Sequence, residues 1–381
     1  MAATAPEDIP EPDRIEGAPH PRETARLHGH DGAEAAFLSA FTSGRLHHGW
    51  LICGPRGVGK ATLAWRLARF LLDAPSDDGG GGLFGAPPPP ETLDTPEDSP
   101  LARRLRALSE PRLFLLRRPW DDKNSRLRQE ITVEEARAMK SFFTLSAADG
   151  GRRVAIIDAA DELNTSAANA VLKLLEEPPA GATFFLIAHQ PHRLLPTIRS
   201  RCRELRLSPL PPEALAQALT AAGGEVSSTD AQPLAELAGG SVGEAFRLTN
   251  LDGLKLYATL IALFSTLPRL DRPRLLALAE AGAGRGAEQQ FDLILSLIDL
   301  FLTRLARAAA TRQLPPEAAP GEAALITRLS DAPDAARRWA DIAQSLAARA
   351  RRGKAVNLDP AALLMDMVLK LEETAGTLAH G

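Results

Sequence analysis

The sequence predicts an α/β domain with a parallel sheet, followed by all-α segments that form a small helical lid and a C-terminal helical bundle. A glycine-rich loop over 54–60 lies between a strand-like run and a helical segment. Two short apolar runs, 154–157 and 183–188, enclose a second helical segment. Apolar runs that alternate with amphipathic helices are typical of buried parallel strands. After Pro209 the strand patterns stop and Ala/Leu-rich segments follow, which predicts the helical part.

Composition limits the function classes. A chain of 381 residues has room for two or three domains, and its net charge of −4 argues against a surface that binds nucleic acid throughout. Cys53 and Cys202 stand in apolar contexts, so we expect buried thiols rather than a disulfide. The most apolar helical stretch, 291–305, carries charges and is predicted to be a core helix. With no signal-peptide pattern at the amino end, we expect a cytoplasmic protein without a membrane partner.

Composition shifts along the chain predict the domain order. Residues 1–20 are rich in proline and acids and are expected to form a disordered tail. The α/β domain is expected over 21–206, interrupted by a Gly/Pro-rich insertion over 77–100. A helical lid over 207–250 and a helical domain over 251–381 should follow. Helical spacing of apolar residues predicts helices over 32–43, 61–72, 132–143, 165–177, 254–264, 273–281, 289–312, 334–349 and 360–373.

The glycine-rich loop has the spacing of a phosphate-binding P-loop. It reads G-x-x-x-x-G-K, and the residues that would hold phosphate are Gly54, Gly57, Gly59 and Lys60. Inward-facing backbone N–H groups, the helix N-terminus and the lysine would together attract phosphate oxygens. The plain alternative is a glycine-rich turn with an incidental lysine. Asp158, at the end of a later apolar run, favours the P-loop because ligands bind at the carboxyl ends of such strands.

A basic run over 103–128 allows two interpretations. Solvated helix and loop surface is the simpler one, and we favour it. The sharper one is a patch that faces nucleic-acid phosphates, since backbone neutralisation needs clustered Arg and Lys without a fixed motif. Directly after this run, Thr132 and Glu135 have the spacing of a capping box and predict the start of a helix.

Four segments together carry a family resemblance. They are Leu46–Trp50 (LHHGW), the NAVLKLLEEPP run over 169–179, Ser200–Cys202 (SRC), and the segment Arg351–Pro360 near the end. With the P-loop, this order resembles the clamp-loader subunits of bacterial DNA polymerase III, a branch of the AAA+ ATPases. The resemblance covers about residues 21 to 375. It implies an AAA+ P-loop module with a helical lid, and a C-terminal helical domain that joins the subunits of the assembly.

The chain departs from active members of this family in its ATPase residues. The residue after the P-loop lysine should carry a hydroxyl for Mg²⁺, and here it is Ala61. Thr62 cannot replace it, because one residue along a helix rotates a side chain by about 100°. The strand aspartate should be followed by a water-polarising glutamate, and here Ala159 follows.

The lid shows a further loss. The resemblance places a γ-phosphate-sensing arginine at the position of Gly243. Asp161 and Glu162 follow Ala159, but we interpret them as surface acids at a helix entry. All of these losses affect hydrolysis, whereas Lys60 and Asp158 remain. The sequence therefore predicts no required cofactor and leaves weak or vestigial ATP binding open.

A zinc site is not expected. Related subunits often carry a four-cysteine zinc module after the P-loop helix, and this chain has no cysteine between Cys53 and Cys202. His47 and His48 are adjacent and lack the spacing of metal ligands. We therefore predict no metal site.

Arg201 of the SRC segment is the predicted catalytic residue. The resemblance implies that it reaches the ATP site of a neighbouring subunit as an arginine finger, a planar and permanently charged group placed against phosphoryl charge. The plain alternative is a helix-end arginine in a surface ion pair, worth about 0–1 kcal/mol.

The sequence thus predicts a non-hydrolysing clamp-loader subunit. Its expected partners are gamma/tau-type motor subunits, a delta-type subunit, the sliding clamp and, through the assembly, primed DNA. One alternative is the ATP-hydrolysing motor subunit itself, which would have to tolerate Ala61 and Ala159. Another is a nucleotide-gated AAA+ scaffold outside replication.

Overall fold

The computed structural model describes residues 11–12, 14–15, 17–75, 88–145, 151–284 and 286–380. The chain divides into two compact units. The first comprises residues 1–224 with 241–243, and the second comprises 225–240 with 244–381. The boundaries that we expected at 206/207 and 250/251 remain predictions. None of the described helices is both long enough and apolar enough to cross a membrane.

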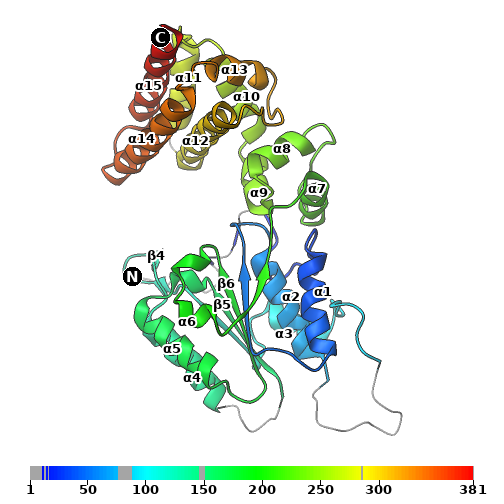
Figure 1. The fold of residues 1–381 in the computed structure, drawn as a ribbon. Coiled ribbons are helices and arrows are strands. Elements are labelled where there is room, and N and C mark those ends of the chain that lie inside the picture. The colour runs from blue at the N-terminus through cyan, green and yellow to red at the C-terminus, as the bar shows by residue number, and fades with distance from the viewer. Residues whose placement is uncertain are drawn as a thin grey trace. The chain divides into compact units, whose positions relative to one another are not determined.

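A parallel sheet forms the centre of the first unit (Figure 1). Its strands are β1 (Gly49–Cys53), β2 (Leu113–Arg117), β5 (Arg153–Asp158), β6 (Ala182–Ala188) and β7 (Arg203–Arg206), in the spatial order β2-β5-β6-β1-β7. Every residue of β1, β5 and β6 is buried, which explains their continuous apolar runs. Registers Cys53↔Ala188 and Asp158↔Ile187 bring the carboxyl ends of these three strands level. The parallel sheet expected from the sequence is therefore confirmed.

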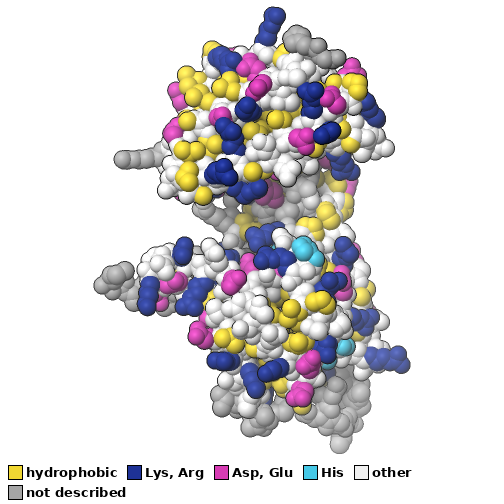
Figure 2. Space-filling model, turned by 60° about the vertical axis from the view of Figure 1, so that its left-hand side comes forward, with side chains coloured by type: hydrophobic (Ala, Val, Ile, Leu, Met, Phe, Trp, Pro, Cys, Tyr) yellow, Lys and Arg dark blue, Asp and Glu magenta, His cyan; other side chains and the backbone are white. Residues whose placement is uncertain are grey.

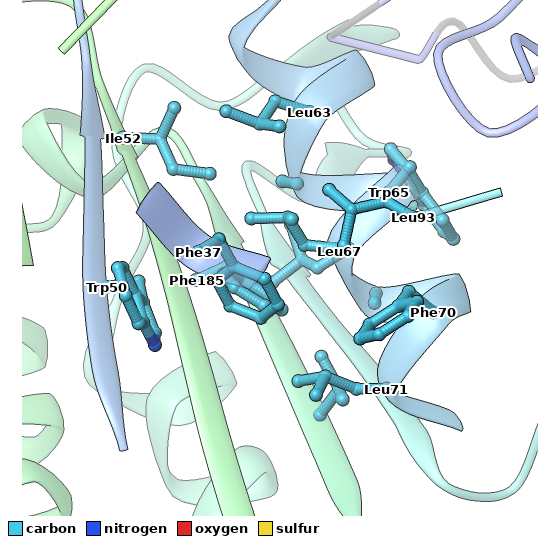
Figure 3. Packing of buried hydrophobic residues seen from close by; sticks show 14 of the residues in the cluster. Phe37, Trp50, Ile52, Leu63, Trp65, Leu67, Phe70, Leu71, Leu93 and Phe185 are labelled. Atoms are coloured by element: carbon cyan, nitrogen blue, oxygen red, sulfur yellow. The ribbon is translucent and has the colours of Figure 1, made fainter. Parts of the chain in front are cut away.

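Helices cover both faces of this sheet (Figure 1). One face holds α1 (Asp31–Thr42), α2 (Lys60–Asp73) and α3 (Pro100–Arg106), and the other holds α4 (Val133–Leu145), α5 (Thr165–Glu176) and α6 (Pro196–Arg199). Aromatic side chains fill the first face (Figure 3). The ring centre of Phe37 lies 4.9 Å from that of Trp50 and 5.9 Å from that of Phe185. The predicted start of α4 is confirmed, and one bond of its capping box is present, since Thr132 N donates to Glu135 Oε2 at 2.8 Å.

The basic run contains a strand that the sequence analysis missed. Residues 113–117 form β2 at the edge of the sheet, and β3 (Trp120–Asp121) pairs with β4 (Arg126–Leu127) in a small antiparallel hairpin. The expectation of helix and loop surface is therefore wrong for these segments. Several arginines of the run neutralise acids of this chain: Glu110 binds Arg104 and Arg112, and Glu162 binds Arg118. On the face of the molecule drawn in Figure 2, basic and acidic side chains are interspersed.

Glu11 lies inside the segment that we expected to be a disordered tail. Its carboxylate contacts Arg22 at 2.7 Å and Arg117 at 2.9 Å. Burial opposes its charge, but these two guanidinium groups hold the pKa of Glu11 below its ordinary value. The tail expectation therefore does not describe Glu11, because ion pairs anchor it to the α/β unit. Residues 1–10 lie outside the described residues, as do positions 76–87, which include the first part of the expected insertion over 77–100.

The second unit is helical, as predicted. All the helices expected beyond residue 251 are confirmed, and α13 is an additional one. The helices of this part of the chain are α7 (Pro212–Ala221, which belongs to the first unit), α8 (Ala231–Ala238), α9 (Val242–Asn250), α10 (Gly253–Phe264), α11 (Arg272–Ala283), α12 (Glu288–Thr311), α13 (Glu322–Leu329), α14 (Ala335–Ala355) and α15 (Pro360–His380). A buried ion pair between Arg304 and Glu322, 2.7 Å apart, joins α12 to α13.

Candidate functional site

The P-loop connects β1 to α2 and follows the predicted strand–loop–helix order. Gly54 leaves the strand where a Cβ atom would lie only 2.3 Å from the carbonyl oxygen of Leu207. Gly57 and Gly59 have left-handed φ angles of 73° and 102°, which glycine adopts without steric cost. The loop therefore needs its glycines for backbone geometry, and its last residue, Lys60, begins α2.

The P-loop lysine is bonded to its own loop. Lys60 Nζ donates to the carbonyl oxygen of Gly54 at 2.8 Å and also to that of Pro55. The side chain is buried, and this burial lowers the pKa of Lys60 to about 8, although Asp158 and Asp161 favour the charged form. The ammonium group of Lys60, which would bind a phosphate, therefore donates to two backbone carbonyls of the loop instead.

The segment 241–243, which belongs to the first unit, covers the loop. Gly243 N donates to the carbonyl oxygen of Gly57 at 3.2 Å, and a Cβ atom at Gly57 would lie 2.1 Å from Ser241 Oγ. A side chain at position 243 would also meet Ile15, 2.5 Å away. The position that the resemblance assigned to a lid arginine is thus packed against the P-loop, where a larger side chain would have to displace Ile15.

Two other positions, 61 and 159, also lack the side chains that active members of the family would carry. Ala61 stands in the first turn of α2, where an active P-loop would offer a hydroxyl to Mg²⁺. Ala159 follows the end of β5 and is 2% exposed. The residues present therefore do not fit a magnesium nucleotide poised for hydrolysis.

Asp158 and Asp161 are brought together near Lys60 at the carboxyl end of the sheet. Both carboxylates are buried, and both favour the charged form of Lys60. Asp161 accepts hydrogen bonds from the backbone N–H groups of His189 and Gln190, at 3.1 and 3.0 Å. Our interpretation of Asp161 as a surface acid is wrong, because it anchors the chain where it leaves β6.

Glu162 is mostly buried as well. Its carboxylate lies 2.8 Å from Arg118 Nε and 3.6 Å from Arg56 Nη2. It therefore links the P-loop to the segment that follows β2, which corrects its interpretation as a surface acid.

His189 is a site residue that the sequence analysis missed. It follows β6 directly, and its Nδ1 atom is buried without a hydrogen-bond partner among the described residues. Burial lowers the pKa of His189 to about 4, and the nearby charge of Lys60 acts in the same direction. The signal that could have found it is its place at the carboxyl end of a buried strand, like that of Asp158.

Arg201 lies at the opposite end of the sheet from the P-loop. It precedes β7, beside the amino end of β1: a Cβ atom at Gly49 would lie 3.1 Å from the carbonyl oxygen of Arg201. The P-loop follows the carboxyl end of β1, and a strand of this length spans about 16 Å. Arg201 and the P-loop residues of the same chain are therefore not brought together.

The guanidinium of Arg201 contacts the LLEEPP run (residues 174–179), which ends the 169–179 segment. Arg201 Nη2 lies 2.9 Å from Glu176 Oε1, and Nη1 donates to the carbonyl oxygen of Thr197 at 3.1 Å. The side chain of Arg201 is 38% exposed and that of Glu176 is 42% exposed. The sequence motifs of 169–179 and 200–202 thus meet in one half-exposed ion pair.

No cluster of three or more His, Cys, Asp or Glu side chains in the described part of the chain could hold a metal ion. Cys53 is buried, and burial raises its pKa to about 12. His47 and His48 stack with their ring centres 4.4 Å apart, and each ring contacts a backbone carbonyl, that of Gly49 or Leu175.

Comparison with known proteins relates the chain to subunits of DNA polymerase III. A family model described as "DNA polymerase III, delta subunit" matches residues 29–211. The DNA polymerase III subunit delta' of Pseudomonas aeruginosa is 35% identical over 43% of this chain and 44% of its own length. That of Escherichia coli is 33% identical over 63% of this chain and 66% of its own length. The subunit tau of Salmonella typhimurium is 29% identical over 72% of this chain and 40% of its own length.

The chain spans between about two fifths and two thirds of the length of these relatives. The residues matched by the family model contain the P-loop, the SRC segment and all five strands of the parallel sheet. The chain is therefore a relative of the delta' subunits of DNA polymerase III.

Proposed function

We propose that this chain is a non-hydrolysing subunit of a DNA polymerase III clamp loader. It acts in the cytoplasm beside gamma/tau-type motor subunits and a delta-type subunit. Its Arg201 enters the ATP site of a neighbouring motor subunit, which drives the loading of a sliding clamp on primed DNA. The chain needs no nucleotide or zinc of its own for this role.

The observation that carries this proposal is the placement of Arg201 at the end of β1 opposite its own P-loop. An arginine that stabilises a transferred phosphoryl group must touch that group. Because its own P-loop is about 16 Å away along the strand, Arg201 can meet such a group only on another molecule. Its partial exposure keeps the guanidinium accessible to a neighbour.

The state of the P-loop supports the absence of hydrolysis. Lys60 is bonded to loop carbonyls, Gly57 is covered by Ser241 and Gly243, and position 61 has no hydroxyl. A phosphate could enter only if Lys60 gave up these carbonyls and the 241–243 segment moved. We infer that any nucleotide binding by this chain is weak and does not lead to turnover.

The similarity to a tau subunit raises a second candidate, an ATP-hydrolysing motor subunit. The two roles make opposite demands on Arg201 and Lys60. In the first role Arg201 acts on a neighbour and Lys60 is dispensable. In the second role Lys60 would bind the phosphates of a nucleotide that this chain hydrolyses.

The deciding experiment compares Arg201→Ala with Lys60→Ala in the reconstituted clamp loader. We expect Arg201→Ala to preserve assembly and to abolish hydrolysis at one neighbouring site, because losing an arginine finger costs about 10³–10⁵-fold there. Arg201→Lys should restore little, since an ammonium group cannot reproduce the planar fork. Lys60→Ala should leave clamp loading nearly unchanged. Loading that is lost with Lys60→Ala but kept with Arg201→Ala would instead identify a motor subunit.

A further inference from the structure

We propose that Glu176 is a positioning residue for Arg201, holding its guanidinium in the orientation that meets the neighbouring nucleotide. This inference rests on the function proposed above. The contact that points to it joins residues 25 positions apart: Arg201 Nη2 lies 2.9 Å from Glu176 Oε1. Of the two adjacent acids in the LLEEPP run, Glu176 is the one that makes this contact.

Two anchors hold the guanidinium at different nitrogens. Glu176 binds Nη2, and the carbonyl oxygen of Thr197 accepts a hydrogen bond from Nη1. An arginine has five N–H donors in a fixed plane, so two anchors determine the direction of the plane and leave donors available for phosphate oxygens. Without Glu176, the remaining contacts, to the Thr197 carbonyl oxygen and to Ser200 Oγ at 3.5 Å, would both fix Nη1 and still permit rotation about that nitrogen.

The backbone that carries Glu176 is itself held in place. Glu176 is the last residue of α5, where the final carbonyl groups lack partners within the helix. The carbonyl oxygen of Leu175 accepts a hydrogen bond from His48 Nε2 at 2.9 Å. Gly49 brings β1 close to both motifs, since a Cβ there would lie 3.2 Å from Leu175 Cδ2 and 3.1 Å from the carbonyl oxygen of Arg201. Glu176 and Arg201 therefore project from a common rigid base.

The charge of Glu176 is unfavourable at this place in the helix. The carboxyl end of a helix carries partial negative charge, so an acid there is destabilising until a cation comes close. Arg201 supplies that cation. The pair is too exposed to contribute much to folding. Its effect is to restrict the rotamers of Arg201 before the neighbour binds, which removes an entropic cost from each encounter.

The test uses the reconstituted clamp loader with its clamp and primed DNA, and measures steady-state ATP hydrolysis. The variants are Glu176→Ala, Glu177→Ala, Arg201→Ala and the double variant Glu176→Ala/Arg201→Ala. Glu177 is the matched control, because it is the adjacent acid in the same motif and is exposed. We expect Glu176→Ala to reduce the Arg201-dependent hydrolysis about twofold to tenfold, the equivalent of freeing one ordered side chain.

The reduction should appear in kcat and not in KM, since the neighbour's ground-state contacts to ATP are unchanged. Glu177→Ala should hydrolyse at the wild-type rate. The double variant should be no slower than Arg201→Ala, because Glu176 acts only through Arg201. A purely structural role would instead slow the double variant further and lower its melting temperature.

The outcomes separate this inference from the proposed function. If Arg201→Ala is silent, the proposed function is wrong. If the Arg201→Ala complex is slow while the Glu176→Ala complex hydrolyses ATP at the wild-type rate or faster, only the positioning role is wrong. A faster rate would mean that the ion pair with Glu176 keeps Arg201 away from the neighbouring nucleotide. Should Glu176→Ala fail to fold, Glu176→Gln decides. Glutamine keeps the size of the side chain and its hydrogen-bond acceptor but loses the charge. A kcat below the wild-type value would support the positioning role, and an unchanged kcat would overturn it.

Discussion

The backbone N–H of Gly243 donates a hydrogen bond to the carbonyl oxygen of Gly57 at 3.2 Å. This bond joins residues 186 positions apart and places the segment 241–243, which belongs to the first unit, on top of the P-loop. Ser241 Oγ fills the space where a Cβ of residue 57 would stand. The covered P-loop is thus a packed structural element of the first unit, and perturbing it should affect stability.

We predict that Gly57→Ala destabilises the protein more than Gly44→Ala does. Both glycines have left-handed φ angles, 73° and 66°, so each alanine carries a backbone cost of about 1–2 kcal/mol. A Cβ at position 44 meets nothing within 4 Å, whereas one at position 57 would lie 2.1 Å from Ser241 Oγ. Overpacking should add about 1–3 kcal/mol at position 57 alone. Urea unfolding would measure the difference, and equal losses would mean that the 241–243 segment does not cover the loop.

The isolated chain should not hydrolyse ATP. Without a hydroxyl at position 61 and a carboxylate at position 159, neither Mg²⁺ nor the attacking water would be held in place. Phosphate release by the purified protein should stay at background with or without primed DNA. A reconstituted complex provides the positive control. Turnover that disappears in Lys60→Ala would contradict the prediction.

His189 should make the protein less stable as the pH falls from about 6.5 towards 4. Burial lowers its pKa from the ordinary value of 6.5 to about 4 in the folded chain. Between these values the unfolded chain binds a proton that the folded chain does not, so stability present above pH 6.5 is lost on acidification. His189→Asn should therefore flatten the dependence of Tm on pH in this interval.

His192 provides the control for that measurement. It lies three residues farther along and is exposed. His192→Asn should keep the wild-type pH dependence of Tm. If His189→Asn and His192→Asn give the same curve, the buried ring of His189 is not the group that titrates.

Arg304→Met should strongly destabilise the second unit. Arg304 Nε lies 2.7 Å from Glu322 Oε1, and the Glu322 side chain is 1% exposed, so its charge would remain buried. Breaking a buried pair by removing one partner costs about 3–5 kcal/mol. Tyr257 Oη, which donates to the same carboxylate at 2.6 Å, cannot neutralise it. Urea unfolding followed by circular dichroism would show the loss.

Arg337→Met is the matched control on a neighbouring helix. Its side chain is 87% exposed and lies 3.9 Å from Asp341, so the pair should contribute about 0–1 kcal/mol. Comparable losses for Arg304→Met and Arg337→Met would show that the buried network does not stabilise this unit.

Local patterns predicted much of the fold. The P-loop spacing, the buried strands around Asp158 and Ala188, and the helices of the second unit were all readable, because 3.6-residue periodicity and continuous apolar runs are short-range signals. β2 was missed since its apolar residues, 113–116, are flanked by arginines that resemble exposed surface. Its identity as a strand depends on pairing with β5, which is 40 residues away.

The sequence by itself determined which chemical groups the chain possesses: a P-loop lysine, a strand aspartate, alanines at positions 61 and 159, and an SRC arginine. Only the tertiary structure decided what these groups contact. Lys60 turns back to Gly54 and Pro55, Gly243 closes on Gly57, and Arg201 pairs with Glu176 at the opposite end of β1. The physical reason is distance along the chain. The covering segment and the ion pair join residues that come together only when the sheet and its helices have closed around a common core, and no local propensity encodes such contacts.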